Sequence, residues 1–268
     1  MNIARRHFLP LFALSLMGAS SRNNTTAQHF TQSALAPTTD DRVYELRIYT
    51  AHPAKLPNVL ARFRDHTTKL FEKHGMKNIG YFTPLDSADG AGEKLVYVLE
   101  HASRSAAKAS WSAFVADPEW KAVAKESEAN GPIVAKIESV FMAATDFSPA
   151  DFRSSNTNRV FELRSYTTPE GKLGDLDARF RDHTITFFTS HNMTSIAYWH
   201  PTDAEKGASN TLMYILAHPS RDAAKANWGA FRTDPAWIAA RTASEANGLL
   251  TTAVKSVFLA PTDFSTLR

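Results

Sequence analysis

Val43-Tyr44-Glu45-Leu46-Arg47 and Val160-Phe161-Glu162-Leu163-Arg164 are the two stretches that decide the fold of this chain. They lie 117 residues apart, and the same offset relates 43–148 to 160–265 without a gap, with about half of the aligned positions identical. The chain is therefore an internal duplication. Two copies of about 106 residues are too long and too few for a solenoid, so we expect two domains, 43–148 and 160–265.

The start of each copy has the two-residue period of a β-strand. In residues 43–50 one face carries Tyr44, Leu46 and Ile48, and the other face is unusually polar, beginning with Glu45 and Arg47. Further strands are expected at 78–83, 95–101 and 134–142.

Helices are expected between these strands. Apolar side chains recur at helical spacing over 55–74, and Gly75 is suited to the left-handed conformation that ends a helix. Asn192, at the equivalent position, is the next most tolerant residue type. A second helix begins near Ser103, breaks at Asp117-Pro118 and ends near residue 131.

This order predicts an α+β, ferredoxin-like unit with a four-stranded antiparallel sheet and both helices on one face. The other face carries aromatic and aliphatic side chains, and the second copy is the nearest cover for it. We therefore predict two tandem ferredoxin-like units that form an intrachain, pseudo-symmetric dimeric α/β barrel, joined by a polar linker at 149–159. Such a chain closes its barrel as a monomer, and further association stays open.

Residues 1–27 are predicted to be an export signal. Arg5-Arg6 precedes a short apolar run, Phe8 to Leu16, in an order that resembles a twin-arginine signal, and an ordinary secretory signal is the alternative. Cleavage is expected near Ser20 or Ala27. The predicted location is periplasmic or extracellular, with 28–42 as a flexible segment before the first domain.

Charge and composition exclude several classes of function. The formal net charge of +3 becomes zero without residues 1–27, which hold three arginines and no acidic residue, so nucleic-acid binding is not expected. No apolar run approaches the roughly 18 residues that span a bilayer. The absence of cysteine excludes disulfides, thiol nucleophiles and cysteine-ligated zinc.

Several spaced motifs together resemble the NIPSNAP family. They are the strand Tyr44 to Tyr49, His74-Gly75-Met76, Ile79-Gly80-Tyr81 and a second helix rich in tryptophan, with mild departures at His191-Asn192-Met193 and Ala197. The resemblance implies membership of the dimeric α/β barrel superfamily, and it assigns no reaction and no catalytic residue. Related barrels include cofactor-free monooxygenases and haem-binding enzymes, so haem is a candidate cofactor by analogy alone.

The polar face of the first strand holds the first candidate ligand residues: Arg47, Tyr49, Arg164 and Tyr166. A guanidinium group can bind an anionic or carbonyl group, and a tyrosine hydroxyl can donate to an oxygen. We expect both guanidinium groups to point into the barrel, where each needs a ligand, water or the glutamate two positions earlier. The structural alternative is an arginine–glutamate pair without a ligand.

Histidines on the helices and at the strand ends are a second candidate set. His66 and His183 could act as a general base or a haem ligand, and a packed, hydrogen-bonded histidine is the alternative. His101 and His218 end the third strand of each copy and are expected to cap the second helix. No ligand spacing typical of a metal site occurs, so no metal is predicted.

Strand tyrosines complete the candidate set: Tyr81, Tyr97, Tyr198 and Tyr214. They could line an aromatic pocket for a flat organic ligand, and barrel packing explains them equally well. Two functions stay open: an exported barrel that binds a small organic ligand or a partner, and a cofactor-free or haem-dependent monooxygenase-like enzyme that uses the cleft between sheet and helices.

Overall fold

Residues 43–51, with their alternating faces, form strand β1 (Val43–Ala51) in the computed structural model of the chain. The structure describes residues 41–152, 154, 155, 157 and 159–268, which belong to one compact unit, Pro37–Arg268. The predicted export signal and residues 28–40 of the predicted flexible segment lie outside the described residues. No helix of the described part is long and apolar enough to cross a membrane.

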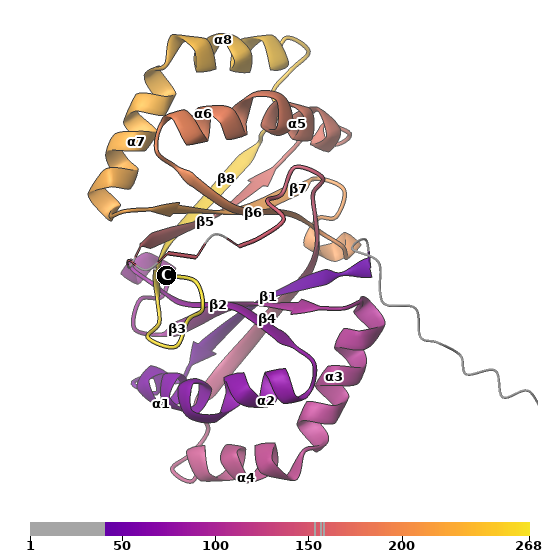
Figure 1. The fold of residues 1–268 in the computed structure, drawn as a ribbon, viewed down its shortest axis with the longest axis vertical. Helices are drawn as coiled ribbons and strands as arrows, with labels where there is room; N and C mark the ends of the chain where they lie inside the picture. The colour runs from indigo at the N-terminus through magenta and orange to yellow at the C-terminus, as the bar shows by residue number, and fades with distance from the viewer. Residues whose placement is uncertain (1–40, 153, 156, 158) are drawn as a thin grey trace, which may run out of the picture. The chain divides into compact units, whose positions relative to one another are not determined.

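Each repeat forms a four-stranded antiparallel sheet of the predicted ferredoxin-like order (Figure 1). In the first repeat the order is β2-β3-β1-β4, and in the second repeat it is β6-β7-β5-β8. The remaining strands are β2 (Lys77–Pro84), β3 (Lys94–His101), β4 (Val134–Ala144), β5 (Val160–Thr167), β6 (Thr194–Pro201), β7 (Thr211–His218) and β8 (Ala253–Pro261).

Four helical segments in each repeat cover the outer face of its sheet (Figure 1). Gly75 and Asn192 both have the predicted left-handed backbone, with φ of 76° and 57°. Asp117 caps its helix as predicted, because its side chain accepts from the Glu119 N–H at 2.8 Å. The helices are α1 (Leu56–Arg62), α2 (Thr68–Lys73), α3 (Arg104–Ala116), α4 (Pro118–Ser127), α5 (Leu173–Arg179), α6 (Ile185–Ser190), α7 (Arg221–Thr233) and α8 (Pro235–Ser244).

The two sheets close into one eight-stranded barrel, as predicted. Strand β2 pairs with β8, and β4 pairs with β6, so neither sheet keeps a free edge. The interior is apolar and contains side chains of both repeats. The ring centres of Phe82 and Phe161 lie 4.9 Å apart, and those of their pseudo-symmetric counterparts, Trp199 and Tyr44, lie 5.7 Å apart. Burial of both inner faces stabilises the pairing of the repeats.

The repeats also exchange their C-terminal tails. After β4 the chain crosses to the second repeat, where Thr145 N–H donates to the Tyr198 carbonyl and Tyr198 N–H donates to Ser148 Oγ, both at 3.0 Å. After β8, Thr262 and Ser265 make the same contacts with Tyr81. Each repeat therefore completes the other, as in a domain-swapped dimer.

Candidate functional site

A buried carboxylate organises the helix-covered face of each sheet. Glu45 is 1% exposed and accepts four hydrogen bonds from side chains. The donors are Arg47 at 2.5 Å, Ser139 at 2.6 Å, Trp111 at 2.8 Å and His101 at 3.0 Å. Burial alone would raise the pKa of Glu45, but these four donors, His101 first, lower it from 4.5 to about 2.

The second repeat reproduces this network around Glu162. Ser256 donates at 2.6 Å, Trp228 at 2.7 Å and His218 at 3.1 Å, and Arg164 is the fourth donor. The pKa of Glu162 is again lowered from 4.5 to about 2, against the effect of burial. Both carboxylates are therefore ionised at neutral pH and are poor general bases.

The prediction that Arg47 and Arg164 point into the barrel is wrong. Both lie on the face that the helices cover. Successive side chains of a strand point to opposite faces, and the adjacent residues Leu46 and Leu163 point into the barrel interior. Each Nε donates at 2.9 Å to a tyrosine hydroxyl on the neighbouring strand of the sheet, Tyr97 of β3 in the first repeat and Tyr214 of β7 in the second. The guanidinium groups are therefore engaged within the fold, as the structural alternative expects.

Each guanidinium group also stacks on a tryptophan, which belongs to α3 in the first repeat and to α7 in the second. The Arg47 Cζ lies 4.2 Å from the Trp111 ring centre, and the Arg164 Cζ lies 4.3 Å from that of Trp228. Arg164 additionally donates to the Tyr166 hydroxyl at 3.3 Å. Burial opposes the charge of Arg164, but its tyrosine and glutamate neighbours raise its pKa above the ordinary value.

His101 and His218 do not cap the second helix of each repeat, contrary to the prediction. Ser103 and Ser220 cap α3 and α7, each accepting from a backbone N–H at 3.1 Å. The histidines are buried and donate from Nε2 to Glu45 and Glu162, because an ionised carboxylate can only accept. A sequence cannot show this partner, which lies on a neighbouring strand.

The four strand tyrosines lie in the core between sheet and helices. Tyr81 and Tyr97 stack with ring centres 5.3 Å apart, and Tyr198 and Tyr214 stack at 5.4 Å. All four are fully buried, and burial raises the pKa of Tyr81, Tyr97 and Tyr214 well above 10. They pack the core and do not line the cavities described below.

A π-helical turn, Phe63–Thr67, decides where His66 lies. A π-turn contains about one residue more than an α-helical turn, so Thr67 takes the position beneath Arg62. The Thr67 Oγ1 donates to the Arg62 carbonyl oxygen at 3.1 Å, and His66 is exposed. His66 is therefore not the packed histidine that regular helical spacing predicts.

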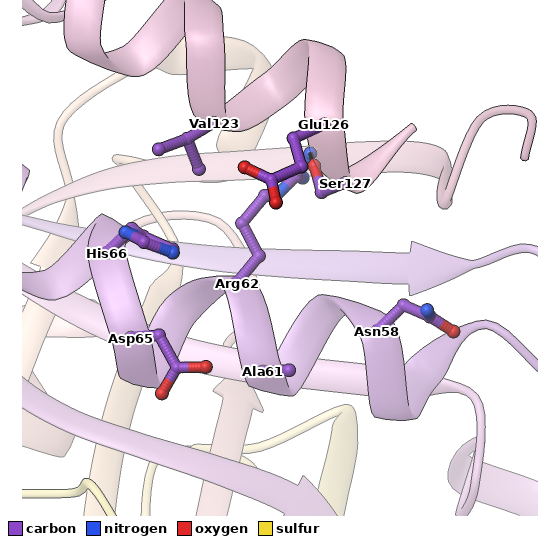
Figure 2. A pocket seen from close by; sticks show the side chains of 8 residues that line it. All are labelled: Asn58, Ala61, Arg62, Asp65, His66, Val123, Glu126 and Ser127. Atoms are coloured by element: carbon purple, nitrogen blue, oxygen red, sulfur yellow. Dashed lines mark hydrogen bonds between the residues drawn. The ribbon is translucent and has the colours of Figure 1, made fainter. Parts of the chain in front are cut away.

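The equivalent turn in the second repeat has the same effect. In Phe180–Thr184, the Thr184 Oγ1 donates to the Arg179 carbonyl at 3.1 Å, and His183 is exposed. His183 does not line the cavity of its own repeat described below. In the first repeat, His66 lines a shallow cavity of about 200 Å³ between α1 and α4, where Arg62 reaches toward Ser127 (Figure 2).

The second repeat contains a larger cavity, of about 330 Å³, between its sheet and its helices. Arg164 and Tyr166 from β5 line it, and the exposed side chains of Val254 and Leu249 lie along it. Six aromatic residues belong to its wall: Tyr166, Phe180, Phe188, Trp228, Phe231 and Trp237. Four arginines also line it: Arg164, Arg179, Arg232 and Arg241. An apolar, aromatic wall with a few fixed polar groups is typical of small-molecule sites.

Two of these arginines have no counterpart in the first repeat. With the offset of 117 residues, Arg232 corresponds to Val115 and Arg241 to Ala124. Arg164 and Trp228 correspond to Arg47 and Trp111, so the repeats share the stacked pair and differ around it. The site prediction found Arg164 and Tyr166 but missed Trp228, Arg232 and Arg241. This comparison of the repeats could have found the two arginines, which differ between the repeats, but not Trp228, which both repeats share.

No group of three histidine, aspartate or glutamate side chains that could hold a metal ion occurs among the described residues. Haem fits the cavity poorly on the chemistry of its donors. The usual haem ligands are histidine, cysteine, methionine and tyrosine, and of these types only Tyr166 lines the cavity, where Arg164 donates to its hydroxyl.

Comparison with known proteins identifies the family. The NIPSNAP family profile matches residues 44–149 and 161–266. The chain belongs to the NIPSNAP family. It carries two NIPSNAP units in tandem, and no curated protein matches it.

Two solved structures share the barrel architecture of this tandem NIPSNAP chain, and a third is similar to part of it. A proposed monooxygenase from Fusobacterium nucleatum is 10% identical over 82% of this chain and 92% of its own, with a TM-score of 0.53. A proposed monooxygenase from Lactobacillus acidophilus is 11% identical over 82% and 94%, with a TM-score of 0.52. A NIPSNAP-like domain protein from Burkholderia xenovorans is 18% identical over 41% and 90%, with a TM-score of 0.36.

Proposed function

We propose that this NIPSNAP protein binds a small, flat organic molecule in the cavity between the sheet and the helices of its second repeat. The observation that carries the proposal is the cavity of about 330 Å³ with six aromatic side chains and the Arg164 guanidinium in its wall. Aromatic rings provide apolar contact area in a fixed geometry, and arginine stacks on or donates to a planar ligand.

The first repeat provides an internal control for this proposal. Val254 lies along the cavity and is 49% exposed, and Ile137, at the equivalent position of the first repeat, is also 49% exposed. A larger side chain at either position has room toward solvent, so neither substitution disturbs the core. Only the one at Val254 obstructs the cavity.

Isothermal titration calorimetry with 1-naphthol, a neutral flat probe, tests the proposal. We expect one bound probe per chain, about tenfold weaker binding in Val254→Trp, and unchanged binding in Ile137→Trp, since tenfold corresponds to the loss of one good apolar contact. Absence of binding, or an equal effect of both substitutions, would contradict the proposal.

A monooxygenase-like activity at the same cavity is the second candidate. The aromatic lining of the cavity favours it, and the names of the neighbours from Fusobacterium and Lactobacillus suggest it. The charges oppose it: Glu162 is held ionised by four donors, and Glu245 is paired with Arg179 at 2.9 Å, so neither carboxylate is free to accept a proton from substrate. Oxygen consumption by the purified protein with a phenolic substrate would favour the enzyme, and binding without turnover would favour the binding role.

The proposed location is the periplasm or the extracellular space, on the basis of the sequence of residues 1–27. Replacement of both Arg5 and Arg6 by lysine is expected to block a twin-arginine route and to leave an ordinary secretory route largely intact. Normal export of the double variant, measured by cell fractionation, would contradict the twin-arginine route.

A further inference from the structure

A second cavity, of about 470 Å³, adjoins the aromatic one in the second repeat. The two share Arg164, Trp228 and Arg232 in their walls, so they are neighbouring chambers of one groove. The second chamber, here the basic chamber, is also lined by Arg221, Lys225 and Ser256.

One face of α7 supplies three of the four basic side chains that line the basic chamber. Arg221, Lys225, Trp228 and Arg232 follow one another at intervals of four, three and four residues, which places them on one side of a helix. Arg221 is held by both carboxylate oxygens of Asp86, at 2.8 and 2.6 Å. Within the described residues, Lys225 and Arg232 have no acidic partner at ion-pair distance. Two carboxylates also line the chamber: Asp222, and Glu162, which is paired with Arg164.

The fold does not require two of the groove's cations, Arg232 and Arg241. Arg232 is replaced by Val115 in the first repeat, where that valine is 59% exposed and the same helix forms. Arg241 of the second repeat pairs with Glu245. In the first repeat the glutamate is kept, as Glu128, but the arginine is replaced by Ala124. The additional positive charge is therefore particular to the groove of the second repeat.

A buried donor lies beside the aromatic chamber, and the first repeat has its equivalent in the Nε of Arg62, which also has no hydrogen-bond partner among the described residues. Arg179 is 5% exposed and lines the chamber. One of its terminal nitrogens donates to Glu245 at 2.9 Å, and its Nε has no hydrogen-bond partner among the described residues. A buried donor without a partner is costly, and an acceptor on a bound molecule would satisfy it.

We propose that the natural ligand is an aromatic molecule with a doubly charged anionic tail, such as a phosphate ester or a pair of carboxylates. The aromatic body occupies the chamber of Trp228 and Trp237, and the tail lies against Lys225 and Arg232. This proposal rests on the proposed function, because it assigns the aromatic body to the same cavity. The first repeat, with Val115 in place of Arg232, does not bind the tail.

Three probes separate the two proposals in calorimetric titrations of the full chain: 1-naphthyl phosphate, 1-naphthol and inorganic phosphate. We expect 1-naphthyl phosphate to bind at least about tenfold more tightly than 1-naphthol, as one or two charge-assisted hydrogen bonds would give. Arg232→Val, which installs the residue of the first repeat, should remove most of that advantage, measured as the ratio of the two affinities in the same variant, because Arg232 lines both chambers and the ratio cancels any change in the aromatic wall. Lys225→Ala should act in the same direction.

A matched substitution in the first repeat is the control. Lys108→Ala, at the position equivalent to Lys225, should leave the binding of all three probes unchanged. If 1-naphthol binds and the phosphate brings no advantage, the anionic tail is refuted and the proposed function stands. If neither aromatic probe binds, both proposals fail, and binding of inorganic phosphate alone would likewise refute the aromatic ligand.

Discussion

Glu45 and Glu162 show how much a single buried residue can depend on partners far away in the sequence. Each accepts from side chains on two other strands and one helix, so its charge is balanced only in the folded chain. The alternation of β1 predicted which residues share a face. It could not predict which face meets the helices. That depends on contacts between elements far apart in the sequence, such as those of the four donors to each carboxylate, which come from four separate elements.

Loss of either charge in a pair should therefore destabilise the protein. We expect Arg47→Met and Glu45→Gln each to lower the free energy of unfolding by about 3–5 kcal/mol, because each leaves the other charge buried without its partner. Urea denaturation followed by tryptophan fluorescence measures this. An Arg47→Met protein as stable as the wild type would show that the guanidinium is held for a ligand and not for the fold.

The free energy of unfolding should also decrease at low pH, because Glu45 and Glu162 become protonated. The folded-state pKa of about 2 lies below the unfolded value near 4.5, so the stabilisation is complete above pH 4.5 and is lost as the pH falls toward 2. Each carboxyl contributes about 3 kcal/mol by this linkage. The stability deficit of Glu162→Gln relative to wild type should shrink between pH 5 and pH 3, and a deficit independent of pH would contradict the assignment.

At the scale of elements, the π-turns of both repeats explain why His66 and His183 are exposed and not packed against the core, as the packed alternative expected. Regular helical spacing places His66 on the same face as Arg62, but the π-turn shifts the following residues, and Thr67 faces the core instead. The repeated Arg-Phe-Arg-Asp-His-Thr sequence marks both turns without revealing their geometry. By contrast, helix ends at Gly75 and Asp117 were predictable, since both depend on local chemistry.

The exposed position of these histidines leads to a prediction. His66→Ala and His183→Ala should change the free energy of unfolding by less than about 0.5 kcal/mol and leave 1-naphthol binding unchanged, as is usual for exposed side chains. Thermal unfolding and calorimetry measure the two effects. A strong loss of binding in His183→Ala alone would restore that histidine to the site.

At the scale of the whole molecule, the duplication predicted the barrel because one sheet face needed a cover. The exchange of tails was not predictable, since Thr145 and Ser148 bond to backbone groups of the other repeat. Ion pairs reinforce the exchange: Arg64 binds Asp263 with two hydrogen bonds, and Arg181 binds Asp146 in the same way.

A single repeat should therefore not persist as a folded monomer. We expect the fragment 37–150 to dimerise or to aggregate, because it exposes the apolar face of its sheet and its tail has only a second copy to pack against. Size-exclusion chromatography with light scattering distinguishes the outcomes. A soluble, folded, strictly monomeric fragment would contradict the role of the barrel interior.

The most direct measurement is a crystal structure of the full chain with 1-naphthyl phosphate. It locates the ligand instead of inferring its position from affinities. Our account predicts one bound molecule per chain, with its rings against Trp228 and its phosphate beside Lys225 and Arg232, and none over Trp111 of the first repeat. Density in both repeats, inside the barrel, or in neither groove at saturating concentration would contradict it.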